Sequence, residues 1–173
     1  MRELFLIGTN HNYQMPLNEE FKNAAEDFCC LLKGICECYS IKNLSEELSL
    51  EALRNRGREE STCQQVAKEL GIRHQFCDLN SEERINLGVE DENSIRSDGW
   101  QHEWNAGRIE SEVRSSHAIR EQHWLDCLMK TDCWPTLFVC GANHIGAFDL
   151  LLRKSGIKVA VVAFDWSPNS SLN

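Results

Sequence analysis

The sequence has no apolar run that approaches the roughly 18 residues of a membrane-spanning helix. Its first residues, MRELFLIGTNHN, hold a short apolar stretch and no small-residue cleavage site, which predicts no signal peptide. Basic residues are the minority, with 18 Lys and Arg against 27 Asp and Glu. The formal net charge of −9 therefore argues against general affinity for nucleic acid or anionic membranes. We expect a cytoplasmic protein with no nucleic-acid or membrane partner.

Several catalytic signatures are also missing. There is no Gly-x-Ser-x-Gly elbow, no Walker-type phosphate loop and no Gly-x-Gly-x-x-Gly, which argues against a nucleotide kinase or a dinucleotide enzyme. The nine cysteines form no zinc-type pairs, so we expect reduced and mostly buried thiols. Cys140 stands just before a glycine and near His144, which allows a thiolate–imidazole pair as one hypothesis and simple burial as the other.

Apolar segments alternate with segments of helical periodicity, which is typical of βαβ units. We predict a single three-layer α/β domain over residues 1–173, with a mainly parallel five-stranded sheet and helices on both faces. A long polar loop is predicted over 89–107 and a flexible tail over 167–173. The predicted strands are Glu3–Ile7, Ile35–Cys38, Ile72–Cys77, Thr136–Cys140 and Ile157–Phe164. The predicted helices are Glu19–Lys33, Glu46–Arg54, Ser61–Leu70, Ile109–Lys130 and Ile145–Lys154.

Polar groups stand where four of these predicted strands end. Two matching Gly-x-Asn-His segments, GTNH and GANH, bring His11 and His144, while Glu37 and Asp78 follow from the second and third strands. In a parallel sheet these ends share one edge, where ligands bind. We predict a divalent-metal set of His11, Glu37 and His144, or a general acid/base pair from the same residues.

Neighbouring residues give the predicted site its remaining groups. Asn10 and Asn143 are candidates for substrate binding together with Asp78, and Asn143 is also a candidate helix N-cap, placing His144 in the first helical turn. Arg120 shares a predicted helical face with His117 and Trp124 and is a candidate clamp for an anionic group of the substrate. The alternatives are structural: a salt bridge for Glu37, a turn or cap for Asp78, and pairing with Glu121 or Asp126 for Arg120.

The motifs GTNH, Glu37 in CEC, REQHW and GANHIGAFDLLLRKSGIKV resemble the TraB/PrgY–TIKI superfamily, with which ChaN-like and erythromycin-esterase-like proteins are grouped. DLNSEER resembles an element of small bacterial members. The resemblance implies an α/β fold and a site of two His, one Glu and one Arg, and some relatives are described as metal-dependent proteases or hydrolases. One departure is that relatives often have paired acids after the second strand, whereas Glu37 is followed by Cys38.

Two hypotheses of different class follow. The first is a hydrolase of a small-molecule or peptide substrate, with His11, Glu37, His144 and Arg120 in the site and a divalent cation as a possible cofactor. Its long loop, with Trp100 and Trp104, is a candidate lid. The second is an acidic, non-enzymatic inhibitor or immunity-type protein that binds a basic protein partner.

Overall fold

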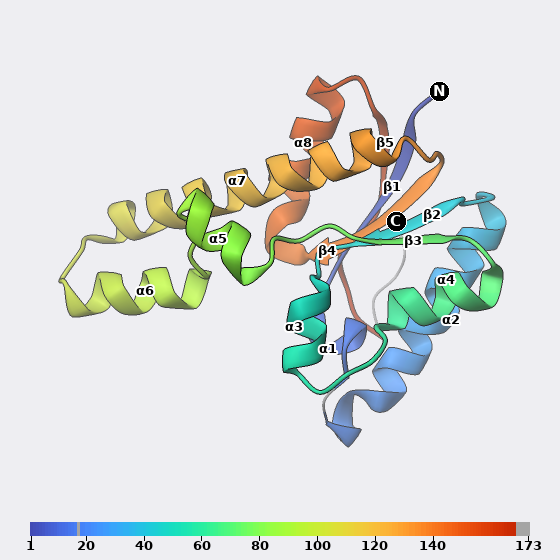
Figure 1. The fold of residues 1–173 in the computed structure, drawn as a ribbon, viewed down its shortest axis with the longest axis horizontal. Coiled ribbons are helices and arrows are strands. Elements are labelled where there is room, and N and C mark those ends of the chain that lie inside the picture. Colours follow the sequence, from blue (N-terminus) through green and yellow to red (C-terminus); the bar gives the residue numbers. More distant parts are fainter. Residues whose placement is uncertain (17, 169–173) are drawn as a thin grey trace.

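The computed structural model describes residues 1–16 and 18–168, and its core is one five-stranded sheet in the order β3-β2-β4-β1-β5 (Figure 1). Every pair of neighbouring strands is parallel. The α/β prediction with a parallel five-stranded sheet is therefore confirmed. The strands are β1 (Glu3–Thr9), β2 (Asn43–Glu46), β3 (Arg73–Phe76), β4 (Thr136–Gly141) and β5 (Lys158–Trp166).

Helices cover both faces of the sheet, as predicted. Among the residues described, no helix is long and apolar enough to cross a membrane. Of the predicted tail, residues 169–173 lie outside the described part of the chain. The helical segments are α1 (His11–Gln14), η1 (Glu19–Phe21), α2 (Lys22–Cys38), α3 (Leu50–Asn55), α4 (Thr62–Leu70), α5 (Ser81–Leu87), α6 (Glu92–Gln101), α7 (Ala106–Thr131), η2 (Ala142–His144) and α8 (Ile145–Lys154).

Alternating side chains of β1 build two cores, one on each side of the sheet. Phe5 and Ile7 pack in the cluster that contains the buried residues of α2 and α4. Leu4 and Leu6 pack in the opposite cluster with residues of α7 and α8. This alternation follows from the two-residue period of a strand, and both faces are covered because a parallel sheet is buried on both sides.

The order of the strands places β4 at a topological switch point. The chain leaves β1 and β2 through helices on one face, α2 and α4, whereas it leaves β4 through α8 on the other face. Since β4 lies between β1 and β2, the connections diverge on both of its sides. A crevice opens at such a point beyond the carboxyl ends of the strands, and ligands bind there in sheets of this kind.

The predicted second strand, Ile35–Cys38, is wrong because α2 continues to Cys38. Ile35 and Cys36 are buried, whereas Glu37 and Cys38 are exposed, which is a helical pattern rather than strand alternation. Gly34 lies inside the helix and does not end it. The true second strand is the polar segment NLSE, Asn43–Glu46, all of whose residues are buried.

The predicted loop over 89–107 contains a helix, α6, which packs against the first half of α7 to form an arm that extends from the sheet (Figure 1). We use the word arm for residues 92–118. Within α6 only Ile95 and Gly99 are buried, so the polar sequence carries almost no periodic apolar signal. Trp100 is 82% exposed, and neither it nor Trp104 lines the cavity beyond the strand ends, so the two tryptophans do not form the predicted lid.

Candidate functional site

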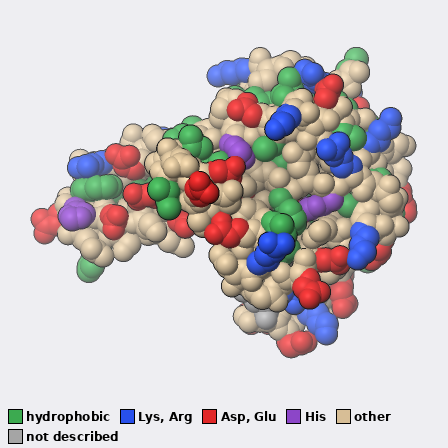
Figure 2. Space-filling model, viewed as in Figure 1, with side chains coloured by type: hydrophobic (Ala, Val, Ile, Leu, Met, Phe, Trp, Pro, Cys, Tyr) green, Lys and Arg blue, Asp and Glu red, His purple; other side chains and the backbone are tan. Residues whose placement is uncertain are grey.

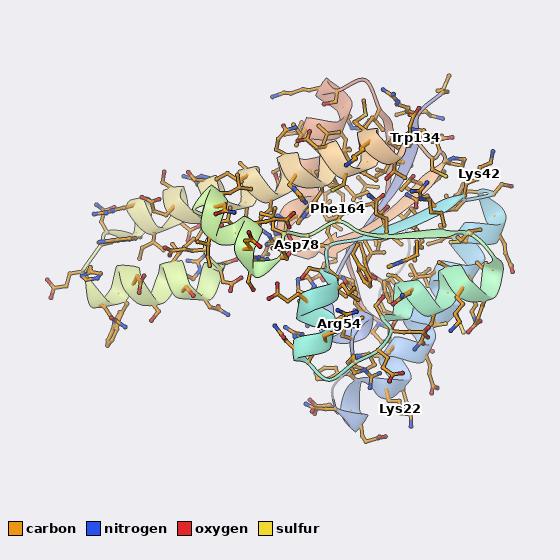
Figure 3. All side chains as sticks on the ribbon, viewed as in Figure 1. Lys22, Lys42, Arg54, Asp78, Trp134 and Phe164 are labelled. Atoms are coloured by element: carbon orange, nitrogen blue, oxygen red, sulfur yellow. The ribbon has the colours of Figure 1, made fainter. Side chains whose placement is uncertain are left out.

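A cavity of about 800 Å³ lies at the carboxyl ends of the strands. It is bordered by residues that follow β1, β2, β3 and β4, by a residue near the end of β5, and by α6 and α7. Figure 3 labels one of these residues, Asp78, where the chain leaves β3 towards α5. The functional side chains that line the cavity are His11, Glu47, Asp78, His117, Arg120 and His144.

Glu47 is the centre of this group. It directly follows β2, and its side chain is only 2% exposed. Its Oε1 lies 3.8 Å from His11 Nε2 and 3.5 Å from His144 Nε2, while its Oε2 accepts a 2.7 Å hydrogen bond from the Gly141 backbone N–H. The two histidines of the matching motifs therefore meet at one carboxylate.

Gly141 leaves room for this close approach. A Cβ atom at this position would lie 3.2 Å from His11 Nε2 and 3.4 Å from Glu47 Oε2. Gly8, in the first motif, is tighter still, because a Cβ there would lie 2.0 Å from the Phe164 carbonyl oxygen. The glycines of the two motifs thus allow side chains and a neighbouring strand to reach the backbone.

The Glu47 carboxylate is held in its charged form. Burial alone would raise its pKa, but the positive charge of Arg120, followed by the electrostatic interactions with the His11 and His144 side chains, outweighs burial and lowers the pKa below its ordinary value. A buried carboxylate among imidazole groups can therefore act as a fixed negative charge.

Arg120 is the cation that pairs with this charge. Its Nη2 donates to Glu47 Oε1, and Nε and Nη2 each donate to one Asp78 oxygen at 3.0 Å. Nη1 lies 3.4 Å from His144 Nε2. Burial would lower the pKa of Arg120, but the two carboxylates raise it further above its ordinary value. Because Nε and Nη2 are engaged by carboxylates of the protein, Nη1 is the part of Arg120 that is left to contact an anionic substrate.

Asp78 holds Arg120 in place by accepting its hydrogen bonds. Besides the two bonds from Arg120, it accepts a 2.6 Å bond from Arg84 Nη2 and a 3.2 Å bond from Trp124 Nε1. Burial would raise the pKa of Asp78, but the nearby guanidinium groups and the Trp124 bond lower it. Asp78 was predicted to bind substrate, yet these contacts use it to position Arg120.

His144 is buried and held on both ring nitrogens. Its Nδ1 lies 2.8 Å from Glu121 Oε1, and its Nε2 faces Arg120 and Glu47. Since Glu121 can only accept when ionised, the ring carries a hydrogen on Nδ1, and Nε2 can accept. The predicted cap is not formed: Asn143 is exposed within η2, and α8 begins after His144 without a side-chain cap.

His11 has a different setting at the end of β1. Its side chain is 44% exposed, and it begins the short helix α1. Here the asparagine of the motif does cap the helix, because Asn10 Oδ1 accepts from the Asn12 N–H at 2.9 Å. His11 is thus the imidazole that solvent and a ligand can reach.

His117 is a site residue that the sequence interpretation did not select. It lies one helical turn before Arg120, its ring centroid is 4.1 Å from that of His144, and its Nε2 is 3.6 Å from Glu92 Oε2 on α6. Burial, reinforced by His144 and Arg120, lowers its pKa to about 4. The only sequence signal was its helical spacing from Arg120 and Trp124.

Glu37 does not belong to the site. It is exposed near the end of α2, close to where the chain enters the sheet again, since the Lys42 N–H bonds to Pro135 O at the start of β4. This is the opposite edge from the carboxyl ends. Glu47, and not Glu37, lies at the carboxyl end of the second strand, directly after Glu46.

Cys140 lies in β4 with its side chain fully buried. Burial, with Glu47 and Glu121 nearby, raises its pKa well above the ordinary range. The thiolate form that a nucleophile needs is therefore disfavoured.

The side chains as arranged do not fit a divalent cation. Ligand atoms must lie about 2.0–2.2 Å from a common point. The oxygen of Glu47 that faces both histidines already accepts from the Arg120 guanidinium, whose positive charge opposes a metal ion there. In the part of the chain that is described, no group of three or more His, Cys, Asp or Glu is arranged to hold a metal.

Comparison with protein-family models, curated proteins and solved structures finds no significant match for this chain.

Proposed function

We propose that the protein is a hydrolase of a small-molecule or peptide substrate, acting by general acid and base catalysis at the strand ends. The observation that carries the proposal is the convergence of His11 and His144 on the buried Glu47 carboxylate at the wall of a cavity. Two imidazoles next to a fixed negative charge are suited to moving protons at neutral pH.

His144 is the proposed base. Its Nδ1–H donates to Glu121, which fixes the ring. Nε2 faces Arg120 Nη1 at 3.4 Å, and this long contact must be exchanged for a water in the cavity before Nε2 accepts a proton. The positive charge that then develops on the ring is stabilised by Glu47 and Glu121. The activated water attacks the electrophilic centre of the substrate.

His11 is the proposed acid. It is exposed to the cavity and lies beside Glu47, so it can donate a proton to the leaving group and regain one from solvent. Asn10 and Asn143 line the same cavity and are the proposed substrate contacts. Arg120 and Asp78 act as positioning residues, since Arg120 donates to Glu47 and Asp78 holds Arg120 at the wall of the cavity.

The test is a panel of chromogenic esters, amides and phosphodiesters with fluorogenic peptides. For any probe that the protein cleaves, His144→Gln is expected to lower kcat by about 100-fold. The matched control is His102→Gln, an exposed histidine next to α6. Equal rates in the two variants would contradict the assignment of His144.

A divalent cation is the other version of this proposal. It would require Arg120 to leave Glu47, after which His11, Glu47 and His144 are the candidate ligands. Metal analysis of protein purified without chelator separates the versions. Stoichiometric metal that is lost in His11→Ala favours the cation, whereas full activity in metal-free protein favours acid/base catalysis.

A second candidate function is the binding of a basic protein partner without catalysis. The observation in its favour is the arm, which extends from the sheet, displays acidic side chains (Figure 2) and carries the exposed Trp100. Calorimetric titration with a Lys-rich peptide tests it. Binding that survives His11→Ala and His144→Ala but is lost in Trp100→Ala would favour this function over hydrolysis.

A further inference from the structure

Two cysteines lie next to residues that position Arg120. Cys77 stands between β3 and Asp78, and Cys127 is on α7, one turn after Trp124. Cys77 is fully buried in the cluster that contains Trp124, and Cys127 is partly buried and packs against the same cluster. Asp78 and Trp124 are hydrogen-bonded to each other, so the two cysteines flank a contact that positions Arg120.

The side chains of β3 bring the two thiols together. Gln75 Nε2 donates to the Cys127 carbonyl at 3.4 Å, and Thr131 Oγ1 donates to Gln75 Oε1 at 2.8 Å. Residues two apart on an extended segment point to the same side, so Cys77 faces α7 as Gln75 does. The Cys77 thiol has a 3.9 Å contact to the Gln75 carbonyl oxygen, and it also lies within interaction reach of Cys127 Sγ.

The two thiols have unlike surroundings. Cys127 Sγ lies 3.5 Å from His123 Nε2, one turn earlier on α7. The hydrogen bond from Cys77 lowers the pKa of Cys127 although burial opposes it. The same bond, together with burial, raises the pKa of Cys77 well above its ordinary range. A partly exposed thiol with more thiolate character next to a buried thiol is the arrangement of an attacking and a resolving cysteine.

We propose that Cys77 and Cys127 form an oxidisable thiol pair that hydrogen peroxide converts into a disulfide. The Cys127 thiolate attacks one peroxide oxygen, the O–O bond breaks, and Cys127 becomes a sulfenic acid; the hydroxide that leaves takes up the proton lost by the Cys127 thiol and becomes water. Cys77 sulfur then attacks the Cys127 sulfur, the S–O bond breaks, and the hydroxyl leaves as water with the Cys77 proton. Two thiols are oxidised by two electrons, and peroxide is reduced to two waters.

The bridge would act on the proposed hydrolase site through Asp78. It joins the residue before Asp78 to α7, the helix that carries Arg120 and Trp124. A covalent link at this place changes how Asp78 presents its oxygens to Arg120, and hence how Glu47 is held. This consequence rests on the proposed function, whereas the oxidation itself does not.

The test is peptide mapping of reduced, full-length protein after treatment with hydrogen peroxide and blocking of the remaining thiols. Trypsin places the two cysteines in separate peptides, HQFCDLNSEER and EQHWLDCLMK. The expected product is these two peptides joined by a disulfide, formed before the exposed thiols of Cys30 and Cys38 are oxidised. Oxidation of Cys30 and Cys38 with Cys77 and Cys127 still blocked as thiols would overturn the proposal.

Variants assign the order of the steps. In Cys77→Ser, Cys127 is expected to stop at the sulfenic acid, which dimedone traps, because the resolving thiol is lost. In Cys127→Ser, Cys77 is expected to stay reduced. If Cys77→Ser does not fold, Cys77→Ala with a melting curve is its replacement, and a Cys127 product identical to that of the unmodified protein would contradict the pairing.

A separate readout tests the link to function. Any hydrolysis found with the probe panel is expected to fall on oxidation and to return with dithiothreitol. A disulfide with unchanged hydrolysis rejects the regulation but keeps the thiol pair. Failure of the disulfide to form leaves the hydrolase proposal unaffected, so the two results are independent.

Discussion

The two Gly-x-Asn-His segments have nearly the same letters and very different settings. His11 is 44% exposed, and its asparagine caps a helix. His144 is 5% exposed and held by Glu121 and Arg120, and its asparagine is exposed and caps nothing. A shared sequence motif therefore placed two histidines at one carboxylate but did not determine what each can do; the neighbouring helix α7 determined it.

Removal of the Arg120 side chain should lower the free energy of unfolding, because Arg120 lies at the carboxylate where the two histidines meet. Arg120→Ala leaves the buried Glu47 carboxylate without its guanidinium partner, whereas Asp78 keeps Arg84. Loss of one partner of a buried ion pair typically costs about 3–5 kcal/mol of unfolding free energy. Urea denaturation measures the change. Arg114→Ala, an exposed arginine on the same helix, is the control and should lie within about 0.5 kcal/mol of the unmodified protein. An equal effect of both changes would contradict the central place of Arg120.

Truncation of the two histidines should separate the segments. His144→Ala leaves the buried Glu121 carboxylate without its 2.8 Å partner, which should cost about 2–3 kcal/mol. His11→Ala removes a partly exposed side chain and should change the unfolding free energy by about 0.5 kcal/mol or less. The same denaturation experiment checks both, and similar losses would remove the distinction drawn here.

Lowering the pH should reduce the stability of the folded protein first through His117, which lies on α7. The pKa of His117 is lowered from 6.5 to about 4, so the unfolded chain binds its proton at higher pH than the folded protein does. Stability should therefore fall as the pH drops from about 6.5 to 4, and fall further as Glu47 and Asp78, whose pKa values are lowered, become protonated. His117→Gln should flatten the first part of this fall in melting curves. An unchanged slope would argue that His117 is not buried as described.

The asparagines should give the smallest difference. Asn10→Ala removes a helix cap and should cost about 0.5–1 kcal/mol. Asn143→Ala removes an exposed side chain without a capping bond, so its effect on the melting temperature should be smaller. A larger loss for Asn143→Ala would show that the second motif is capped after all.

Much of the fold could be predicted because β1, β4 and β5 are apolar segments with clear ends, and their glycines and histidines followed directly. The second strand could not, because NLSE is polar. Several of its side chains bond one another and their neighbours, although Asn43 Oδ1 and Glu46 Oε2 are buried without a hydrogen-bond partner among the described residues. Asn43 bonds to Ser45, and Glu46 accepts from Ser61 and His74. The more apolar GICEC segment was therefore predicted to be the second strand. Glu47, which follows the true second strand, was missed for this reason.

The α6 part of the arm escaped prediction for a related reason, whereas its α7 part from Ile109 onward lies in the predicted helix Ile109–Lys130. A surface helix is normally recognised in the sequence by apolar residues at helical spacing. Helix α6 buries only Ile95 and Gly99, and it is held in place by packing against α7. His117 was missed as a consequence, since its partner Glu92 lies on α6. Contacts between two polar helices depend on tertiary structure that local periodicity does not contain.

The most direct test of the account compares Glu47→Gln with Glu37→Gln on the same hydrolysis panel. The two changes remove the same charge, one from the buried carboxylate between the histidines and one from the exposed end of α2. We expect Glu47→Gln to lose about 100-fold in kcat and Glu37→Gln to keep the rate of the unmodified protein. Equal rates for the two variants, or no turnover of any probe by the unmodified protein, would contradict the proposed site.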